Sequence, residues 1–187
     1  ASLSPFTDNS AKAFDYMGKA WLNLGKSAEA IKVYQQAIRI YPNDDAFRLA
    51  LGDIYLKVGN EAEALKSYEA AVRLNPRSAD SRYSLGQAYI NAGQLDAARE
   101  QFAQVARLSP TSAAGFYGLG QTARLAKDYP EAELQLEKAI AVNRNFEKAY
   151  TELGFTYADK GDFLKASEQV TELSARESSQ ANALELY

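Results

Sequence analysis

The side chains that carry out most protein chemistry are scarce in this sequence. It contains no cysteine and no histidine, which excludes disulfides and cysteine nucleophiles and removes the commonest general base and metal ligand. The remaining candidates are carboxylate pairs such as Asp44–Asp45 and Glu61–Glu63. Both pairs fall where we expect helices to begin, and acidic side chains interact favourably with the helix dipole there. We therefore expect no catalysis, no cofactor and no bound metal.

The overall composition is that of an ordinary folded protein and argues against two classes of partner. The 187 residues have a formal net charge of −3 and are 47% hydrophobic, which is ordinary for a globular chain. Nucleic-acid binding needs clustered lysine and arginine and is not expected. No apolar run approaches the ~20 residues of a membrane span, so membrane insertion is not expected either. The chain opens at Ala1, which fits a cytoplasmic protein or an exported one whose signal has been cleaved.

Glycine and proline recur along the chain with a period of 34 residues (for example 52 − 18 = 34). The glycines are Gly18, Gly52, Gly86, Gly120 and Gly154, and the prolines are Pro42, Pro76 and Pro110. In the most regular copy, residues 51–76, apolar residues recur at spacings of three and four on both sides of Gly59. This predicts two helices, each with one buried face, separated by a glycine stop. Neither helix is long enough to be stable alone, so successive copies must stack on one another.

This pattern resembles the tetratricopeptide repeat, whose 34-residue unit has the signature W-x2-L-G-x2-Y…A-x3-F…P. The matching residues of the second copy are Leu51, Gly52, Tyr55, Ala64, Tyr68, Ala71 and Pro76. The resemblance covers residues 11–177 and implies an all-α fold, a right-handed α-solenoid. It implies five helix-turn-helix repeats, at residues 11–44, 45–78, 79–112, 113–146 and 147–180.

The two ends of the chain lie outside this repeat pattern. We expect residues 1–10 to form a loosely ordered lead-in, in which Phe6 covers the end of the first helix. Residues 178–187 are either a disordered tail or a short capping helix that covers the last repeat. The side chains that would cover it are Leu184, Leu186 and Tyr187.

The fourth and fifth repeats depart from the signature. Lys127 stands where the other repeats have the stop glycine, which predicts a strained left-handed residue. We expect Asp128 to cap the following helix and Pro130 to support its first turn. In the fifth repeat, Val170 and Leu173 replace the phenylalanine and the second alanine of the signature. Such a second helix is typical of a terminal repeat.

The tetratricopeptide resemblance also implies a binding groove lined by the first helix of each repeat. The second, fifth, ninth and twelfth positions of that helix share one face, and the thirteenth lies beside them. Amides there can bond a peptide backbone, and tyrosines offer stiff contact area, so we expect a peptide segment or helix of a partner protein to bind. The candidate residues are Asp15, Lys19, Asn23, Leu49, Asp53, Tyr83, Gln87, Asn91, Tyr117, Gln121, Arg124 and Thr151. The alternative is that these tyrosines pack against the neighbouring helix while the amides are solvated.

One known binding mode of the family is not expected here. Some tetratricopeptide arrays clamp the C-terminal carboxylate of chaperones with lysine and asparagine at fixed groove positions. None of the three possible registers supplies the paired cations. The register on the first three repeats, for example, holds Asp15, Lys19, Ala50, Asp80 and Ser84.

Charge is graded along the array. Residues 11–44 include five basic and three acidic residues, whereas residues 147–180 include four basic and seven acidic ones. Ends of opposite sign would favour head-to-tail contact between copies, although solvated helix faces explain the same charges. The function we expect is a protein-interaction scaffold. The alternatives are a self-assembling homo-oligomer and an accessory domain of a larger enzyme or secretion complex.

Overall fold

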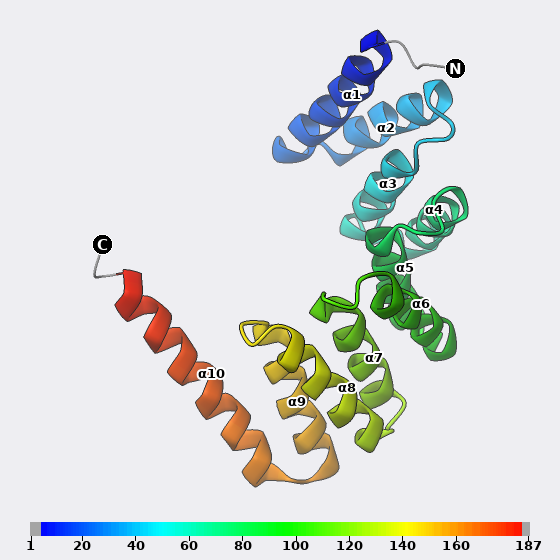
Figure 1. Cartoon of the computed structure of the whole chain (residues 1–187). Coiled ribbons are helices and arrows are strands. Elements are labelled where there is room, and N and C mark those ends of the chain that lie inside the picture. The colour runs from blue at the N-terminus through cyan, green and yellow to red at the C-terminus, as the bar shows by residue number, and fades with distance from the viewer. Residues whose placement is uncertain (1–4, 185–187) are drawn as a thin grey trace. The chain divides into compact units, whose positions relative to one another are not determined.

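The computed structural model describes the backbone of residues 5–184 and the side chains of residues 10–175. Over this part of the chain it contains ten α-helices and no β-strand, so the predicted all-α fold is confirmed (Figure 1). The helices are α1 (Pro5–Asn23), α2 (Ser27–Ile40), α3 (Asp45–Lys57), α4 (Glu61–Leu74), α5 (Ala79–Asn91), α6 (Leu95–Leu108), α7 (Ala113–Leu125), α8 (Tyr129–Val142), α9 (Glu147–Lys160) and α10 (Phe163–Leu184). The predicted covering roles of Phe6, Leu184, Leu186 and Tyr187 concern side chains outside the described part.

The chain divides into two compact units, Ala1–Ala92 and Gly93–Tyr187, which are described separately. In the first, the N-terminal unit, each helix from α1 to α5 packs against the next one. In the second, the C-terminal unit, the same holds from α6 to α10, and α7 also contacts α9. Packing of each helix on its nearest neighbours is the arrangement of an α-solenoid of tetratricopeptide type.

Polar residues define where several of these helices begin. The side chains of Asp44, Ser78 and Ser112 accept hydrogen bonds from backbone N–H groups in the first turns of α3, α5 and α7. Asn60 and Asp128 do the same for α4 and α8, and the cap at Asp128 was predicted from the sequence. These caps fix the residue at which each helix begins, and therefore which side chains face the core.

Small and large side chains alternate in the core of each repeat. Positions within a repeat are counted from its first residue, which is 11, 45, 79, 113 or 147. In the second repeat, Ala64 at the twentieth position is fully buried, and the ring of Tyr68 at the twenty-fourth is almost so. That ring lies against Gly52 of the eighth position, where an added Cβ would be 2.5 Å from it. A side chain at residue 52 would therefore displace the tyrosine ring, which explains the recurring glycine.

A lysine occupies one of the left-handed turn positions. Gly59 ends its repeat's first helix with φ 78°, and Lys127 has φ 63° at the corresponding place in the fourth repeat. The strained lysine predicted from the sequence is therefore confirmed. Among the described residues, Lys127 is the one non-glycine with positive φ, and its Cβ makes this conformation unfavourable by about 1 kcal/mol.

We expect Lys127→Gly to raise the free energy of unfolding of the C-terminal unit by about 0.5–1 kcal/mol, because glycine adopts φ 63° without strain. Urea denaturation followed by circular dichroism measures the change. The matched control is Lys138→Gly, which puts glycine inside α8 and should lower stability by about 1 kcal/mol. A loss of stability in Lys127→Gly would contradict the strain argument.

The structure differs from the sequence prediction at both ends. Helix α1 begins at Pro5, so residues 5–10 are helical and do not form a loose lead-in. Proline is favourable in a first turn because the N–H groups there have no partner within the helix. Helix α10 runs without a break from Phe163 to Leu184, through the boundary predicted at residue 178. Residues 163–184 contain neither glycine nor proline, so nothing in them ends the helix.

Candidate functional site

In α1, the predicted groove residues form an ion pair that also serves the core. The Lys19 ammonium lies 2.6 Å from a carboxylate oxygen of Asp15. The Tyr34 hydroxyl, from a buried ring, donates a hydrogen bond of 3.1 Å to the other oxygen. The hydrogen bond and the charge of Asp15 raise the pKa of Lys19. Asp15 therefore has two structural partners, whereas Lys19 is exposed.

In α3, Asp53 has the same dual role. The hydroxyl of the buried Tyr68 donates a hydrogen bond of 2.7 Å to the Asp53 carboxylate. Although Asp53 is exposed as a residue, its carboxylate is partly desolvated by its neighbours. This desolvation raises its pKa, and the tyrosine hydrogen bond opposes the rise. Among the predicted groove residues of the first two repeats, Lys19 is an exposed cation, and Asp15 and Asp53 are carboxylates bonded to buried tyrosines.

In α5, an aromatic side chain and an amide lie together. Tyr83 is half-buried, and burial raises the pKa of its hydroxyl, while a hydrogen bond with Gln87 opposes that rise. Tyr83 and Gln87 are one turn apart on the helix, which brings their side chains to one face. They form a contiguous surface in the N-terminal unit with an aromatic ring and an amide.

In α7, Tyr117 belongs to the core. It is 9% exposed and packs edge-on against Phe146, with ring centroids 5.4 Å apart. It also belongs to the buried cluster that contains Leu136 and Leu153. The sequence left open whether the tyrosines of this stripe face a partner or pack against a neighbouring helix. Tyr117 packs within the core.

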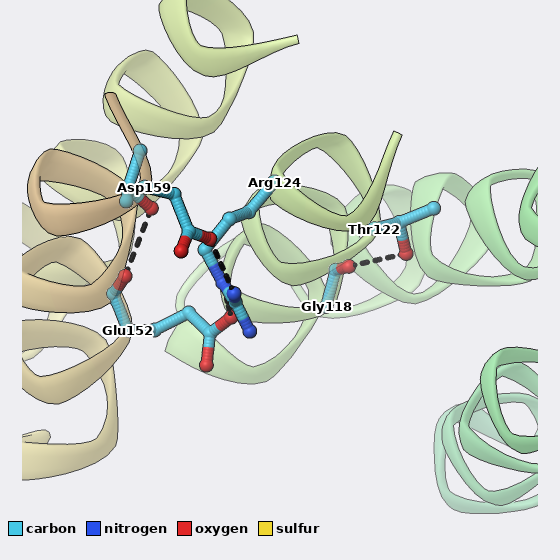
Figure 2. A network of polar contacts seen from close by, with 6 residues as sticks. Gly118, Thr122, Arg124, Glu152 and Asp159 are labelled. Atoms are coloured by element: carbon cyan, nitrogen blue, oxygen red, sulfur yellow. Dashed lines mark hydrogen bonds and ion pairs between the residues drawn. The ribbon is translucent and has the colours of Figure 1, made fainter. Parts of the chain in front are cut away.

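Arg124 joins α7 to α9 through two ion pairs (Figure 2). Its Nε lies 2.6 Å from Glu152, and its Nη1 lies 2.7 Å from Asp159. The Arg124 side chain is 20% exposed and that of Glu152 is 7% exposed. Burial opposes the charge on Arg124, but its hydrogen bonds to the two carboxylates and their charges outweigh burial and raise its pKa. The guanidinium also lies over the ring of Phe155, 5.7 Å from its centroid.

Hydrogen bonds within α7 and α9 accompany this network. The Thr122 hydroxyl donates to the carbonyl of Gly118, and the Thr156 hydroxyl donates to the carbonyl of Glu152, at 2.7 and 2.8 Å (Figure 2). Both threonines are buried. Arg124 is therefore held within a network that positions two helices, and its role in binding a partner stays a prediction.

The other predicted residues differ in exposure. Leu49 packs against the core cluster of α4 and α5, and Gln121 is half-buried on α7. Asn23 and Asn91 are exposed at the last residues of α1 and α5. Thr151 is exposed on α9 and donates a hydrogen bond to a backbone carbonyl one turn earlier. Asn23, Asn91 and Thr151 are thus accessible to a partner, and Leu49 belongs mainly to the core.

Sequence reasoning overlooked two residues of the C-terminal unit that shape this surface. Glu152 stands at the sixth position, where the three preceding repeats have Ala50, Ser84 and Gly118. A long charged residue among small ones was a visible signal of a special contact. Phe155 occupies the ninth position of its helix, which belongs to the predicted groove stripe, and the residue is 54% exposed.

An apolar pocket lies between α9 and α10. Its volume is about 440 Å³, and its lining includes Gly154, Phe155, Ala166, Val170 and Leu173. An added Cβ at Gly154 would meet nothing closer than 3.5 Å, in contrast to the close packing at Gly52. The second helix of the fifth repeat therefore does not fill the space beside the glycine of its first helix.

The described residues contain no cluster of acidic side chains that could hold a metal ion. None of the helices in this part of the chain has the length and apolar character needed to cross a bilayer.

Stacked helix pairs with a repeating core, and a non-repeating face on the first helix of each pair, define the class of helical-repeat interaction proteins. Residues 49–113 and 83–149 match a family model described as "Tetratricopeptide repeat", and residues 18–59 match one described as "TPR repeat". The chain belongs to the tetratricopeptide repeat family, as predicted from its sequence. Proteins of this family are generally non-enzymatic, and in this general sense the chain is a protein-interaction scaffold. The comparison with curated proteins finds no match.

Several solved structures share the fold. A crystal structure of MamA is 26% identical, with a TM-score of 0.77 over 89% of this chain and 97% of that one. TTC0263, a thermophilic TPR protein in Thermus thermophilus, is 21% identical, with a TM-score of 0.71 over 90% and 97%. The pilF protein of Pseudomonas aeruginosa is 19% identical, with a TM-score of 0.78 over 90% and 77%. These similarities show an all-α solenoid of tetratricopeptide repeats.

Proposed function

We propose that this scaffold binds a peptide segment or a helix of a partner protein on its groove face. In each unit the groove face is formed by the fifth, ninth, twelfth and thirteenth positions of the first helices, which are α1, α3 and α5 in the N-terminal unit and α7 and α9 in the C-terminal unit. The observation that carries the proposal is the ninth position, which changes its chemistry from repeat to repeat while the core behind it repeats. Its residues are Lys19, Asp53, Gln87, Gln121 and Phe155.

The groove face of the N-terminal unit suits a polar or extended segment. Lys19 and Asp53 offer one charge of each sign, and Asn91 offers an exposed amide. An amide can both donate to and accept from a peptide backbone, so it binds extended chain without requiring a particular side chain. Tyr83 adds aromatic contact area with a polar tip. We therefore expect a partner segment recognised by backbone hydrogen bonds and by a few charges of both signs.

The C-terminal unit contributes differently. Tyr117 and Arg124 are engaged within the unit, so we assign them the role of holding α7 and α9 in place. The Arg124 guanidinium supports one face of the Phe155 ring. An exposed aromatic ring held in this way is a suitable anchor for an apolar side chain of the partner.

A photo-reactive amino acid placed at residue 53 or 91 is expected to crosslink a bound partner in native lysate. The matched controls carry it at residues 66 and 99, where Lys66 and Arg99 are exposed on the second helices α4 and α6. Mass spectrometry of the crosslinked peptides identifies the partner segment. Crosslinks from all four residues alike, or only from residues 66 and 99, would contradict binding at the groove face.

A further inference from the structure

Residues at the junctions between successive repeats complement one another in size. The twenty-fourth residue of one repeat meets the sixth residue of the next, as an added Cβ on Gly118 would lie 2.3 Å from the Phe102 ring. At the junction of the first and second repeats these two residues are Tyr34 and Ala50. At the junction of the second and third repeats they are Tyr68 and Ser84. At the junction of the fourth and fifth repeats the twenty-fourth residue is the smaller Leu136, and the sixth residue is the longer Glu152. A large residue in one repeat is thus matched by a small one in the next.

The fifth repeat offers the smallest residue of this series, Val170. In the four preceding repeats the corresponding side chain is almost completely buried, whereas Val170 is 61% exposed. Val170 and Leu173 form one wall of the pocket of about 440 Å³ beside Gly154. In the preceding repeats, the first helix of the next repeat packs on this surface. In the fifth repeat the corresponding surface of α9 and α10 is open and apolar. We call this surface, defined by Gly154, Phe155, Ala166, Val170 and Leu173, the tail face.

Helix α1 carries the complementary surface. Its third, sixth, seventh and tenth positions are all exposed, and we call them the head face. They are Ala13, Tyr16, Met17 and Ala20. In α3 the corresponding Phe47, Leu51 and Ile54 are buried. Tyr16, which is 71% exposed, is the one aromatic residue at the sixth position of any repeat.

We propose that the tail face of one copy of this chain binds the head face of a second copy. The second copy's α1 would lie on α9 and α10 as a following first helix does, with Tyr16 in the pocket over Val170. The size relation at the other junctions favours this occupant. Val170 is the smallest of the twenty-fourth residues, and it would meet Tyr16, the one aromatic sixth residue. Tyrosine also suits the position, since it buries a large apolar ring and can keep its hydroxyl at the rim.

The charges of the two repeats support the same pairing. Residues 11–44 have five basic and three acidic residues, a net charge of +2, and residues 147–180 have four basic and seven acidic ones, a net charge of −3. Opposite charge favours encounter between the two ends of different copies, and the association should weaken at high salt. The two faces are different surfaces, so the contact is heterologous, and an open assembly of any length keeps one head face at one end and one tail face at the other.

Sedimentation velocity over a concentration series tests the proposal with two single variants. Tyr16→Glu places a charge on the head face, and Val170→Glu places one on the tail face. Each variant alone is expected to remain monomeric at concentrations where the wild type associates, with association weakened more than about tenfold. Equal amounts of the two variants are expected to form a one-to-one heterodimer, because each keeps the face that the other has lost. Leu134→Glu, an exposed position on α8, is the control and should associate like the wild type.

Circular dichroism of each variant must first match the wild type, which separates loss of contact from loss of fold. The proposal is overturned if the wild type is monomeric throughout the series, or if either variant associates as the wild type does. A mixture that gives no heterodimer, or a face occupied only by a different protein, would overturn it as well. Residues 53 and 91 lie outside both faces, so this result and the crosslinking result are independent.

Discussion

Replacing Gly115 with alanine is expected to lower the free energy of unfolding of the C-terminal unit by about 3 kcal/mol. Gly115 lies where α7 crosses α6, and an added Cβ would be 2.4 Å from the backbone nitrogen of Ala106 and 2.7 Å from its Cα. Backbone atoms of a packed helix cannot move aside as a side chain can, so the two helices must separate along their contact. Overpacking of this kind typically costs about 1–3 kcal/mol, and a backbone obstacle places Gly115 at the upper end.

The fifth repeat supplies a matched control for this substitution. Gly154 is also inside a helix, but an added Cβ there would meet nothing closer than 3.5 Å. Alanine should therefore raise stability at residue 154 by about 0.5–1 kcal/mol, through the lower conformational entropy of the unfolded chain. Chemical denaturation of both variants gives the comparison. Equal changes at the two glycines would show that helix propensity, rather than close packing, governs these positions.

The second large effect is expected at the ion-pair network of α7 and α9. Arg124→Met should lower the free energy of unfolding by about 3 kcal/mol, because it leaves the Glu152 carboxylate without its charged partner. The two side chains are 20% and 7% exposed, so this ion pair is mostly buried. Urea denaturation at neutral pH measures the loss.

A double-mutant cycle separates the pair from its surroundings. Adding Glu152→Leu to Arg124→Met removes the uncompensated charge and should recover most of the lost stability. The exposed pair of Lys66 and Glu63 is the control, and its removal should change stability by less than about 0.5 kcal/mol. If the double variant were as unstable as Arg124→Met alone, the loss would come from the packing of the arginine stem and not from the buried carboxylate.

Most of the fold could be predicted because its determinants are local and repeat. Gly59 and Asn60 specify a helix end and the next helix start within two neighbouring residues, and the structure has both. Even the irregular turn at Lys127 followed from its position in the period. The first helix was misjudged because its initial turns precede the first repeat, where the period carries no information. The long α10 was misjudged for the corresponding reason at the other end.

The groove face was harder to predict because the outward or inward direction of a side chain depends on its neighbours. Tyr83 and Tyr117 stand at the same position of successive repeats, yet Tyr117 is buried against Phe146. Phe146 belongs to the loop before α9, and no rule about position within α7 accounts for its contact with Tyr117. Arg124 likewise took its role from Glu152, which lies 28 residues away. The exposure of a groove residue therefore depends on its contacts with the neighbouring repeat. The signature describes residues within one repeat and does not predict such contacts.

The two buried tyrosine hydroxyls bear on how freely the partner preference of this protein can be redesigned. Tyr34 and Tyr68 donate to Asp15 and Asp53, so the acidic groups of the N-terminal unit's groove face are also needed in its interior. Exchanging Asp53 for an apolar residue would remove the carboxylate to which the buried Tyr68 hydroxyl donates, so adaptation there requires a second, compensating change in the core. The Tyr34 hydroxyl also donates a hydrogen bond of 3.4 Å to the backbone carbonyl of Asp15, which a change of the Asp15 side chain leaves in place. The first two repeats therefore differ in how many changes a new partner preference would require.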